Sequence, residues 1–243
     1  MTPRVFGLIG RHIDYSFSRS YFSDKFSRKG LDAYSYRNFD LGSIDEVAHV
    51  FQTPFLSGIN VTIPYKEQIR SYLDALSDTA REIGAVNTIV LQDGKRIGHN
   101  TDYIGFLETL RPLLRPHHDR ALILGTGGAS KAVAYALSQL HIPYEVVSRE
   151  GELTYDQLSV GILRENRIIV NCTPLGTYPD ISVFPPLPYE GFTSDHVAYD
   201  LIYNPAETTF LSKAKAQGAI IQNGYDMLVA QAEAAWQLWQ SSF

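Results

Sequence analysis

The sequence predicts an α/β protein with two domains. Short apolar runs that suit buried strands alternate with segments of helical periodicity along most of the 243 residues. Roughly the first hundred residues hold a complete β-α-β-α-β-α-β-β order. A second series begins after Pro112 and Pro116, where a fully apolar strand leads into a glycine-rich turn and a helix. A chain of this length accommodates two small domains.

The expected first domain covers residues 1–102. We predict helices at residues 21–29, 44–52 and 67–73, and strands at residues 5–9, 33–39, 58–63 and 85–91 with a return strand ending near Gly98. Pro64 ends the third strand, and the Thr53-Pro54 pair ends the second helix, because the residue before proline avoids the helical region.

The expected second domain covers residues 103–224 and is followed by a tail. We predict helices ending at Leu110 and at residues 130–140 and 208–217, and strands at residues 121–124, 144–148, 167–171, 197–201 and 219–222. Gly218 is a usual C-terminal helix stop. The tail, residues 225–243, carries a long helix at 226–240 with two tryptophans.

Composition and charge narrow the classes of function. Hydrophobic residues make up 44% and charged residues 19%, which is ordinary for a folded protein. The formal net charge of -5 argues against nucleic-acid binding by bulk charge. There is neither a long apolar stretch for a membrane span nor a signal-peptide core. Because Cys172 is the single cysteine and the histidines lack ligand spacing, we expect a cytoplasmic, metal-free protein.

Residues 121–140 predict a dinucleotide site. The apolar strand is typical of a buried parallel sheet, and Gly125-Thr126-Gly127-Gly128-Ala129 follows it immediately before a helix. Glycines allow backbone to approach a pyrophosphate, and the helix N-terminus offers N–H groups and partial positive charge. A glycine pattern alone also fits an ordinary turn, and a third glycine would fall at Ser130. The flanking strand and helix favour a Rossmann-type domain.

The end of the next strand bears on the choice of cofactor. A carboxylate there binds the ribose 2′-hydroxyl of NAD, whereas an arginine suits the 2′-phosphate of NADP. The strand ends at Ser148-Arg149, so we expect NADP with Arg149 at its adenosine phosphate. Glu150 opposes this expectation because a carboxylate repels a phosphate, and Arg149 also fits a solvated surface charge.

Two polar segments of the first domain stand at strand ends. Asn60 and Thr62 alternate with apolar residues and so share one face, with Lys66 just beyond them, and Asp102 ends a second such segment. Ligands of α/β sheets gather at these strand ends, so we expect Lys66 and Asp102 to meet in a cleft. A lysine beside a carboxylate can exchange the proton of an alcohol or ketone oxygen, while a cofactor moves the hydride. The same spacing equally fits a structural ion pair.

Six segments, taken in order, resemble the shikimate dehydrogenase family almost end to end. They are residues 60–67 (NVTIPYKE), 84–88 (GAVNT), 98–106 (GHNTDYIGF), 171–176 (NCTPLG), 199–205 (YDLIYNP) and 223–231 (NGYDMLVAQ). The resemblance implies an N-terminal substrate domain and a C-terminal Rossmann-type NADP domain with a cleft between them, and a tail that packs back onto the first domain. It also implies reversible NADPH-dependent reduction of 3-dehydroshikimate to shikimate, an oxidoreductase step of the chorismate pathway in aromatic amino acid biosynthesis.

The resemblance also implies roles for individual residues. Lys66 and Asp102 match the catalytic pair. The matching substrate residues are Ser16 and Ser18 for the carboxylate, Thr62, Asn87, Asp102 and Gln231 for the ring hydroxyls, and Tyr203, which also fits a buried core aromatic. The matching cofactor residues are Gly125, Thr126, Gly127, Gly128, Ala129, Ser148, Arg149, Thr173, Leu201 and Gly224. The implied partners are these small molecules, without nucleic acid, membrane or metal, in a monomer or homodimer.

The chain departs from the family pattern in three places. The usual His-Ser-x-Ser-Pro is Tyr15-Ser16-Phe17-Ser18-Arg19, which adds a positive charge near the carboxylate site. The usual Asn-Arg-Thr is Ser148-Arg149-Glu150, which lacks the threonine hydroxyl that would help hold the 2′-phosphate. Asp226 replaces a glycine of the last motif.

Three alternative functions remain in view. A quinate/shikimate dehydrogenase using NAD or NADP is kept open by Glu150, and quinate differs from shikimate only by an added tertiary hydroxyl and a saturated ring. A non-catalytic sensor of shikimate or NADP has no need of a pair such as Lys66 and Asp102. Cys172 is a poor candidate for a nucleophile, because no sequence-local base is evident and buried structural cysteine is commoner.

Overall fold

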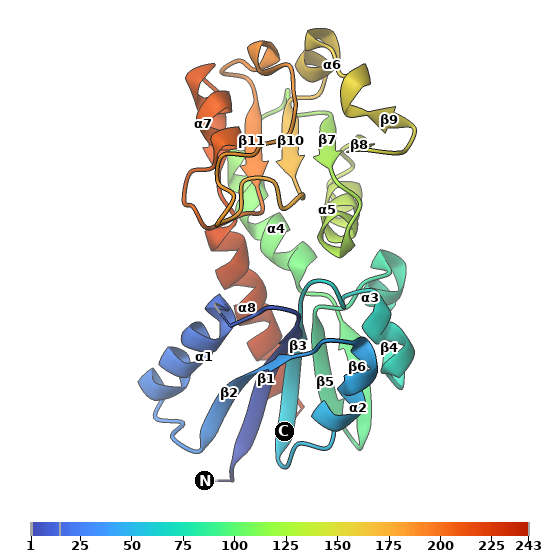
Figure 1. Ribbon diagram of the computed structural model, residues 1–243, viewed down its shortest axis with the longest axis vertical. Helices are drawn as coiled ribbons and strands as arrows, with labels where there is room; N and C mark the ends of the chain where they lie inside the picture. Colours follow the sequence, from blue (N-terminus) through green and yellow to red (C-terminus); the bar gives the residue numbers. More distant parts are fainter. Residues whose placement is uncertain (1, 15, 243) are drawn as a thin grey trace. The chain divides into compact units, whose positions relative to one another are not determined.

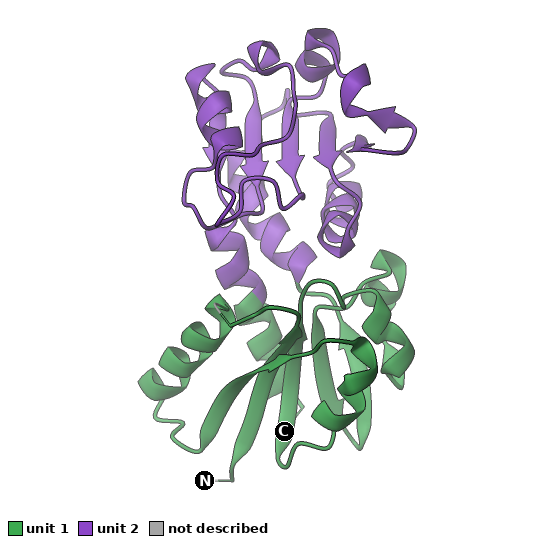
Figure 2. Ribbon diagram, viewed as in Figure 1, with its two compact units in different colours: residues 1–101, 232–243 green, residues 102–231 purple. Residues whose placement is uncertain are grey.

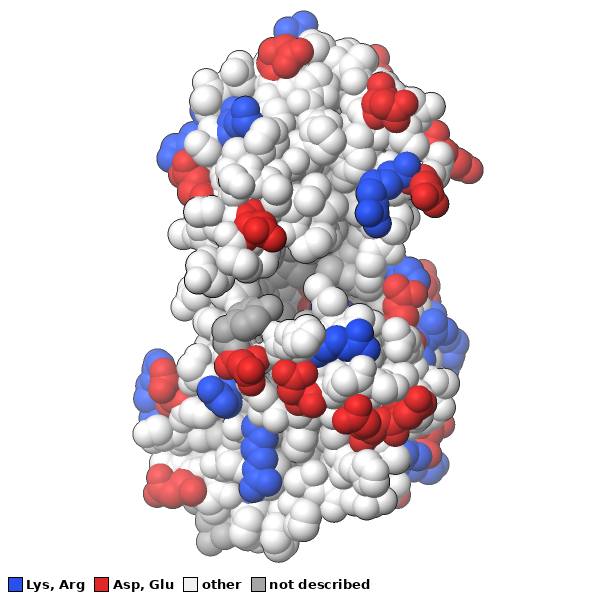
Figure 3. All heavy atoms as spheres, viewed as in Figure 1, with Lys and Arg blue, Asp and Glu red and all other residues white. Residues whose placement is uncertain are grey.

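A computed structural model describes residues 2–14 and 16–242 of the chain. Tyr15, from the expected substrate loop, lies outside the described residues. The chain divides into two compact units, unit 1 (residues 1–101 and 232–243) and unit 2 (residues 102–231) (Figure 2). Basic and acidic side chains are interspersed on the drawn face of each unit (Figure 3). Across the described residues, no helix has the length and apolar character to cross a bilayer.

Unit 1 is built on a mixed sheet (Figure 1). Its strands are β1 (Arg4–Gly10), β2 (Tyr34–Asp40), β3 (Leu56–Val61), β4 (Ala75–Leu76), β5 (Thr88–Gln92) and β6 (Lys95–His99). They lie in the order β2-β1-β3-β5-β6-β4. The first three run parallel, whereas β5 is antiparallel to both β3 and β6. The carboxyl ends of β1, β2 and β3 therefore share one edge of the sheet.

Two of the helices expected in unit 1 are shorter than the sequence pattern predicts, whereas the helix expected at residues 21–29 begins earlier and spans Phe17–Arg28. The helix expected at residues 44–52 is a 3₁₀ turn, η1 (Ile44–Glu46), followed by α2 (Val47–Val50), and residues 67–73 form only the 3₁₀ helix η2 (Gln68–Tyr72). The unexpected α3 (Asp78–Ile83) has a Ser77 N-cap that accepts from the Ala80 N–H at 3.2 Å. Such short helices depend on packing against the sheet, which periodicity alone does not reveal.

The two faces of this sheet bury separate cores. One face packs α2, η2 and α3, and the other packs α1 (Phe17–Arg28) and the end of the C-terminal helix α8 (Tyr225–Gln240). Trp239 of α8 is fully buried, and its indole donates to the Ile89 carbonyl at 3.0 Å. Gly58 on β3 leaves the space that this indole occupies. The tail helix is thus part of the unit 1 core.

Unit 2 is built on an all-parallel sheet. Its strands are β7 (Ala121–Leu124), β8 (Tyr144–Ser148), β9 (Leu153–Thr154), β10 (Ile168–Asn171), β11 (Val197–Asp200) and β12 (Ile220–Gln222). Their order is β12-β11-β10-β7-β8-β9, which is the Rossmann arrangement with its reversal between β7 and β10. One face packs α4 (Asp102–Leu110), α5 (Gly128–Gln139) and Met227 of α8, and the other packs α6 (Val160–Glu165) and α7 (Thr209–Ala216). The sequence predicted this fold class correctly, but α6 and β9 were not expected.

Replacing Trp239 by alanine should destabilise unit 1 by about 3–5 kcal/mol, because a large core side chain and a buried hydrogen bond are both lost. Trp239→Phe keeps an aromatic ring and should cost less. Urea unfolding followed by the fluorescence of the remaining Trp236 measures both. The control is Gln237→Ala at an exposed position of the same helix. A loss below about 1 kcal/mol in Trp239→Ala would contradict the anchoring role.

Candidate active site

The glycine-rich turn of unit 2 is shaped to receive a phosphate. β7 leads directly into Gly125, whose φ of 104° lies in the left-handed region that favours glycine. The helix α5 begins at Gly128 with Gly127 as N-cap, two residues earlier than expected. Apart from Gly127 itself and its neighbours in the chain, no atom of the described residues lies within 4 Å of where a Gly127 Cβ would stand, and no acidic residue occupies the first turn of α5. Residues 125–129 therefore fit the pyrophosphate of a dinucleotide.

The end of β8 carries the groups expected at the adenosine phosphate. Arg149 is exposed and lines a shallow pocket with Thr154, Tyr155, Asp156 and Pro186. The Ser148 hydroxyl donates to the Glu150 carbonyl at 2.6 Å. Sequence reasoning missed Thr154, Tyr155, Asp156 and Pro186, because none lies in a recognisable motif. The Arg149 guanidinium shares this region with the carboxylates of Glu150 and Asp156.

Thr173, Leu201 and Gly224, expected on the nicotinamide side, come together at strand ends in unit 2. The Thr173 hydroxyl donates to the Asn171 side-chain oxygen at 2.7 Å, and the Leu201 N–H donates to the Asn171 carbonyl at 3.0 Å. The Gly224 N–H donates to the Ile202 carbonyl, next to Leu201 in the chain, at 3.0 Å. Hydrogen bonds of the backbone or of side chains therefore hold all three residues just after the ends of β10, β11 and β12.

The buried carboxylate of Asp200 holds the segments around Thr173 and Leu201 in place through hydrogen bonds. It accepts hydrogen bonds from the Asn171 amide (3.0 Å), the Ile202 N–H (3.0 Å) and the Thr208 hydroxyl (2.6 Å). Burial raises the pKa of Asp200 to about 6, although these three hydrogen bonds act in the opposite direction. Sequence reasoning assigned no role to Asp200.

Cys172 does not have the surroundings of a nucleophile. Burial raises the pKa of its thiol well above the ordinary value, and the nearby Asp200 carboxylate adds to this shift. Because the thiolate is the reactive form, the thiol is a structural group at neutral pH.

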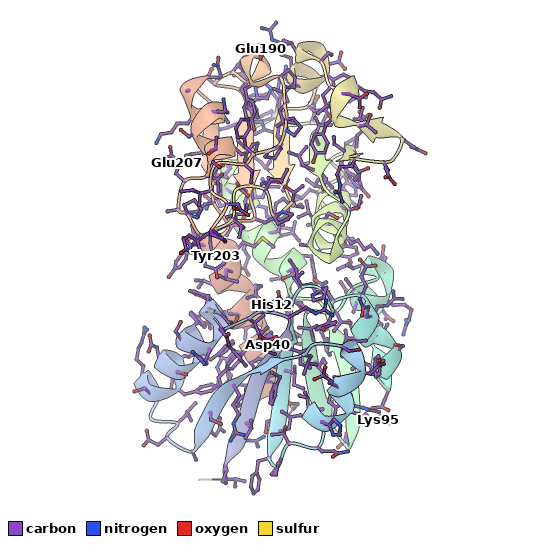
Figure 4. All side chains as sticks on the ribbon, in the orientation of Figure 1. His12, Asp40, Lys95, Glu190, Tyr203 and Glu207 are labelled. Carbon is purple, nitrogen blue, oxygen red and sulfur yellow. The ribbon has the colours of Figure 1, made fainter. Side chains whose placement is uncertain are left out.

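The loop that leads to the expected carboxylate-binding serines is anchored at the end of β2. The Asp40 carboxylate accepts from the backbone N–H groups of His12 (2.9 Å) and Ile13 (3.2 Å), and Figure 4 labels Asp40 and His12. Ser16 occupies the N-cap position of α1, yet its hydroxyl accepts no capping bond. Ser18 lies in the first turn of α1 and is buried. Both serines thus lie at the start of α1, the element that follows β1 in the chain.

A buried polar cluster surrounds Asn87. The Thr101 N–H donates to the Asn87 side-chain oxygen at 2.6 Å, and the Asn87 amide donates to the Thr101 hydroxyl at 2.9 Å. Asn60 of β3 donates to the Asn87 carbonyl at 3.3 Å and to the Thr88 hydroxyl at 3.2 Å. Tyr36 donates to the Asn60 side-chain oxygen at 2.8 Å. Tyr36, Thr88 and Thr101 had no role in the sequence reasoning, because it does not show which strands are neighbours.

The expected proton-transfer residues each follow a strand of unit 1 in the chain, Lys66 after β3 and Asp102 after β6. Lys66 is half-buried after β3, and its carbonyl accepts from the Val86 N–H at 2.8 Å, next to Asn87 in the chain. Thr62 is half-buried, with its N–H bound to the Ile9 carbonyl at 2.8 Å. Asp102 is buried at the start of α4, directly after Thr101. Lys66 belongs to unit 1, and Asp102 is the first residue of unit 2.

Two further expected substrate residues lie in unit 2. Tyr203 is half-buried on the loop after β11 (Figure 4), so it is not a fully buried core aromatic. Gln231 is buried on α8, and its amide donates to the Leu228 carbonyl at 2.8 Å.

Comparisons with known proteins decide the family. The "Shikimate dehydrogenase substrate binding domain" family matches residues 8–89. A curated relative from Carboxydothermus hydrogenoformans, named "Shikimate dehydrogenase (NADP(+))", is 37% identical over 97% of this chain and 91% of its own length. The chain belongs to the shikimate dehydrogenase family.

Solved structures of shikimate dehydrogenase family members and relatives share the fold. The Thermus thermophilus shikimate 5-dehydrogenase, described in complex with NADP(H) and shikimate, has a TM-score of 0.87 and 33% identity, covering 98% of this chain and 94% of that one. A Corynebacterium glutamicum quinate dehydrogenase in complex with NAD has a TM-score of 0.88 and 27% identity, covering 99% and 95%.

The raised pKa of Asp200 predicts a pH dependence of stability. Since the folded pKa lies above the ordinary 3.8, its stabilising contribution is complete below pH 4 and is lost as the pH rises through about 6. Asp200→Asn removes this loss. The difference in unfolding free energy between pH 4 and pH 7 should therefore shift by about 3 kcal/mol relative to wild type, from roughly two pH units at about 1.4 kcal/mol each.

Urea unfolding at several pH values measures this shift, and Asp180→Asn at an exposed site of unit 2 is the control. Parallel pH profiles for wild type and Asp200→Asn would show that Asp200 titrates normally.

Proposed function

We propose that the protein is an NADP-dependent shikimate dehydrogenase that reversibly reduces 3-dehydroshikimate to shikimate in the chorismate pathway. One observation carries the proposal: the same chain contains both a polar cluster and a Rossmann sheet with an open glycine turn. The polar cluster surrounds Asn87, and the backbone of Lys66 is hydrogen-bonded to Val86, the residue before Asn87. Relatives matched along nearly their whole length are named for this reaction. The proposed setting is the cytoplasm, as a monomer or homodimer.

We assign a separate ligand to each part of the chain. Residues 1–102, completed by the helix at 225–243, form the proposed substrate-binding and catalytic domain, and residues 103–224 form the dinucleotide domain. Hydroxyl donors suit a carboxylate, so Ser16 and Ser18 bind that end of shikimate. The ring hydroxyls, each both donor and acceptor, suit the mixed donor and acceptor groups of Thr62, Asn87, Asp102 and Gln231. Tyr203 completes the substrate side.

The proposed NADP site uses the groups described at the strand ends of unit 2. Residues 125–129 hold the pyrophosphate, Ser148 and Arg149 hold the adenosine phosphate, and Thr173, Leu201 and Gly224 line the nicotinamide. When bound, NADPH supplies the hydride.

Lys66 is the proposed proton carrier of the reaction. As the C3 carbonyl of 3-dehydroshikimate becomes an alcohol, its oxygen needs a proton, and the Lys66 ammonium donates it. Asp102 holds the same hydroxyl by accepting a hydrogen bond. After each forward turnover neutral Lys66 regains a proton from solvent, and in the reverse direction neutral Lys66 takes the proton of the C3 alcohol and releases it to solvent.

A second candidate function is a quinate/shikimate dehydrogenase that also uses NAD. Glu150 and Asp156 near Arg149 favour it, because two carboxylates weaken the attraction for a 2′-phosphate. The similarity to a quinate dehydrogenase in complex with NAD points the same way.

Reduced-nicotinamide absorbance distinguishes these functions when shikimate and quinate are each offered with NADP and with NAD. Rapid reduction with shikimate and NADP alone supports the main proposal. Turnover with quinate or NAD supports the second candidate. Folded protein that binds shikimate without any turnover would instead be a sensor.

Replacing Lys66 by alanine should lower kcat by about 10²–10⁴, the usual size of a general-acid contribution. Lys95→Ala, at an exposed lysine of β6 labelled in Figure 4, is the matched control and should leave kcat unchanged. Steady-state rates with shikimate and NADP measure both variants. Turnover of Lys66→Ala near the wild-type rate would remove Lys66 from this role.

Changes at the end of β8 should alter cofactor preference. Arg149→Ala should raise KM for NADP about tenfold and leave KM for NAD nearly unchanged, because only the 2′-phosphate interaction is lost. Glu150→Thr should shift preference toward NADP by removing a repulsive charge and adding a hydroxyl. Equal changes for both cofactors in Arg149→Ala would mean that Arg149 does not distinguish them.

A further inference from the structure

A continuous row of buried polar groups crosses the unit 1 sheet beneath the proposed substrate site. It begins at Tyr36 of β2, whose hydroxyl bonds Asn60 of β3. Asn60 in turn bonds Thr88 of β5 and the carbonyl of Asn87. Each of these four residues is less than 9% exposed. The row therefore ends at the asparagine assigned to the ring hydroxyls.

The direction of every hydrogen bond in this row follows from the backbone. The Asn87 carbonyl can only accept, so the amide nitrogen of Asn60 faces it and the Asn60 oxygen faces Tyr36. The Tyr36 hydroxyl must then donate its single proton to Asn60.

The Tyr36 side chain is suited to this span. β1 lies between β2 and β3, and strands are about 4.8 Å apart, so a group on β2 must reach roughly 9–10 Å to bond one on β3. The ring is stacked on Phe22 of α1 at a centroid distance of 4.8 Å and an interplanar angle of 10°. This packing holds the phenol in place without using its hydroxyl. Burial also raises the pKa of Tyr36 above its ordinary range, so the hydroxyl keeps its proton.

We propose that Tyr36 is a positioning residue that sets the ring-hydroxyl end of the substrate site through its hydrogen bond to Asn60. This inference rests on the proposed function of Asn87. Through Asn60 and Thr88, Tyr36 fixes the amide of Asn87, whose oxygen also accepts from Thr88 at 3.1 Å.

Tyr36→Phe keeps the stacked ring and removes the hydroxyl. Calorimetry should show a Kd for shikimate raised about tenfold, and kinetics should show KM for shikimate raised by a similar factor with a smaller change in kcat. The Kd for NADP should not change. Tyr34→Phe is the matched control, since Tyr34 is two residues away on the same strand and packs in the same core. It should bind shikimate as the wild type does.

Thr88→Val provides a second variant that leaves Tyr36 in place and breaks the row further along. It should also raise the Kd for shikimate, because Asn60 and Asn87 both lose a partner. In the double variant Tyr36→Phe with Thr88→Val, the effects should be less than additive because both changes act on the same row of hydrogen bonds.

Several results would overturn the proposal for Tyr36. They are a shikimate Kd within twofold of wild type in Tyr36→Phe and Thr88→Val, an equal rise in the Kd for NADP, and additive effects in the double variant. If the wild type turns over shikimate while any of these results holds, the inference alone fails. If the wild type neither binds nor oxidises shikimate, the proposed function fails with it.

Discussion

The hydrogen bond from the Thr101 backbone N–H to the Asn87 side-chain oxygen is the constraint on which the polar interior of unit 1 depends. A backbone N–H can only donate, so it fixes which way the Asn87 amide points. Asn60, Thr88 and Tyr36 are oriented in the same way by groups with a single possible role. A buried polar group without a partner is costly, and full pairing makes one arrangement much more stable than its alternatives. Asp102 follows Thr101 directly in the chain, so the position of its backbone depends on the same hydrogen bond.

In unit 2 a charged group, the Asp200 carboxylate, orients a buried polar side chain. Asn171 at the end of β10 is oriented by the Asp200 carboxylate, and its oxygen then accepts from the N–H and the hydroxyl of Thr173. Burying a carboxylate costs free energy, which the raised pKa of Asp200 expresses. Its third partner, Thr208, caps α7, so one carboxylate joins the loop after β10 to the start of a helix. The buried carboxylate lowers the local stability of this region, but its hydrogen bonds give Thr173 a single orientation.

The sequence was most informative where a local pattern has one structural solution. The apolar strand and glycine turn at residues 121–129 predicted β7 and the start of α5 because strand, turn and helix are encoded in adjacent residues. The short helices α3 and α6 escaped prediction, since a helix of this length is stable only through packing. Lys66 and Asp102 were proposed because each follows a predicted strand end, and Asn87 was proposed because its segment resembles a motif of the family. Tyr36 and Thr154 were not found, because a tyrosine or threonine in a strand is ordinary until its neighbours are known.

The amino-acid sequence by itself determined the α/β class, the glycine turn, the family and the candidate ligand-binding residues, because each of these is a local pattern or an ordered set of motifs. Only the tertiary structure decided which polar groups share hydrogen bonds. Strand order brings Tyr36, Asn60 and Thr88 together from positions far apart in the chain. It also places Asp200 within hydrogen-bond distance of Asn171. Donor direction and burial, which set the pKa of Asp200 and the orientation of Asn87, are properties of that three-dimensional neighbourhood.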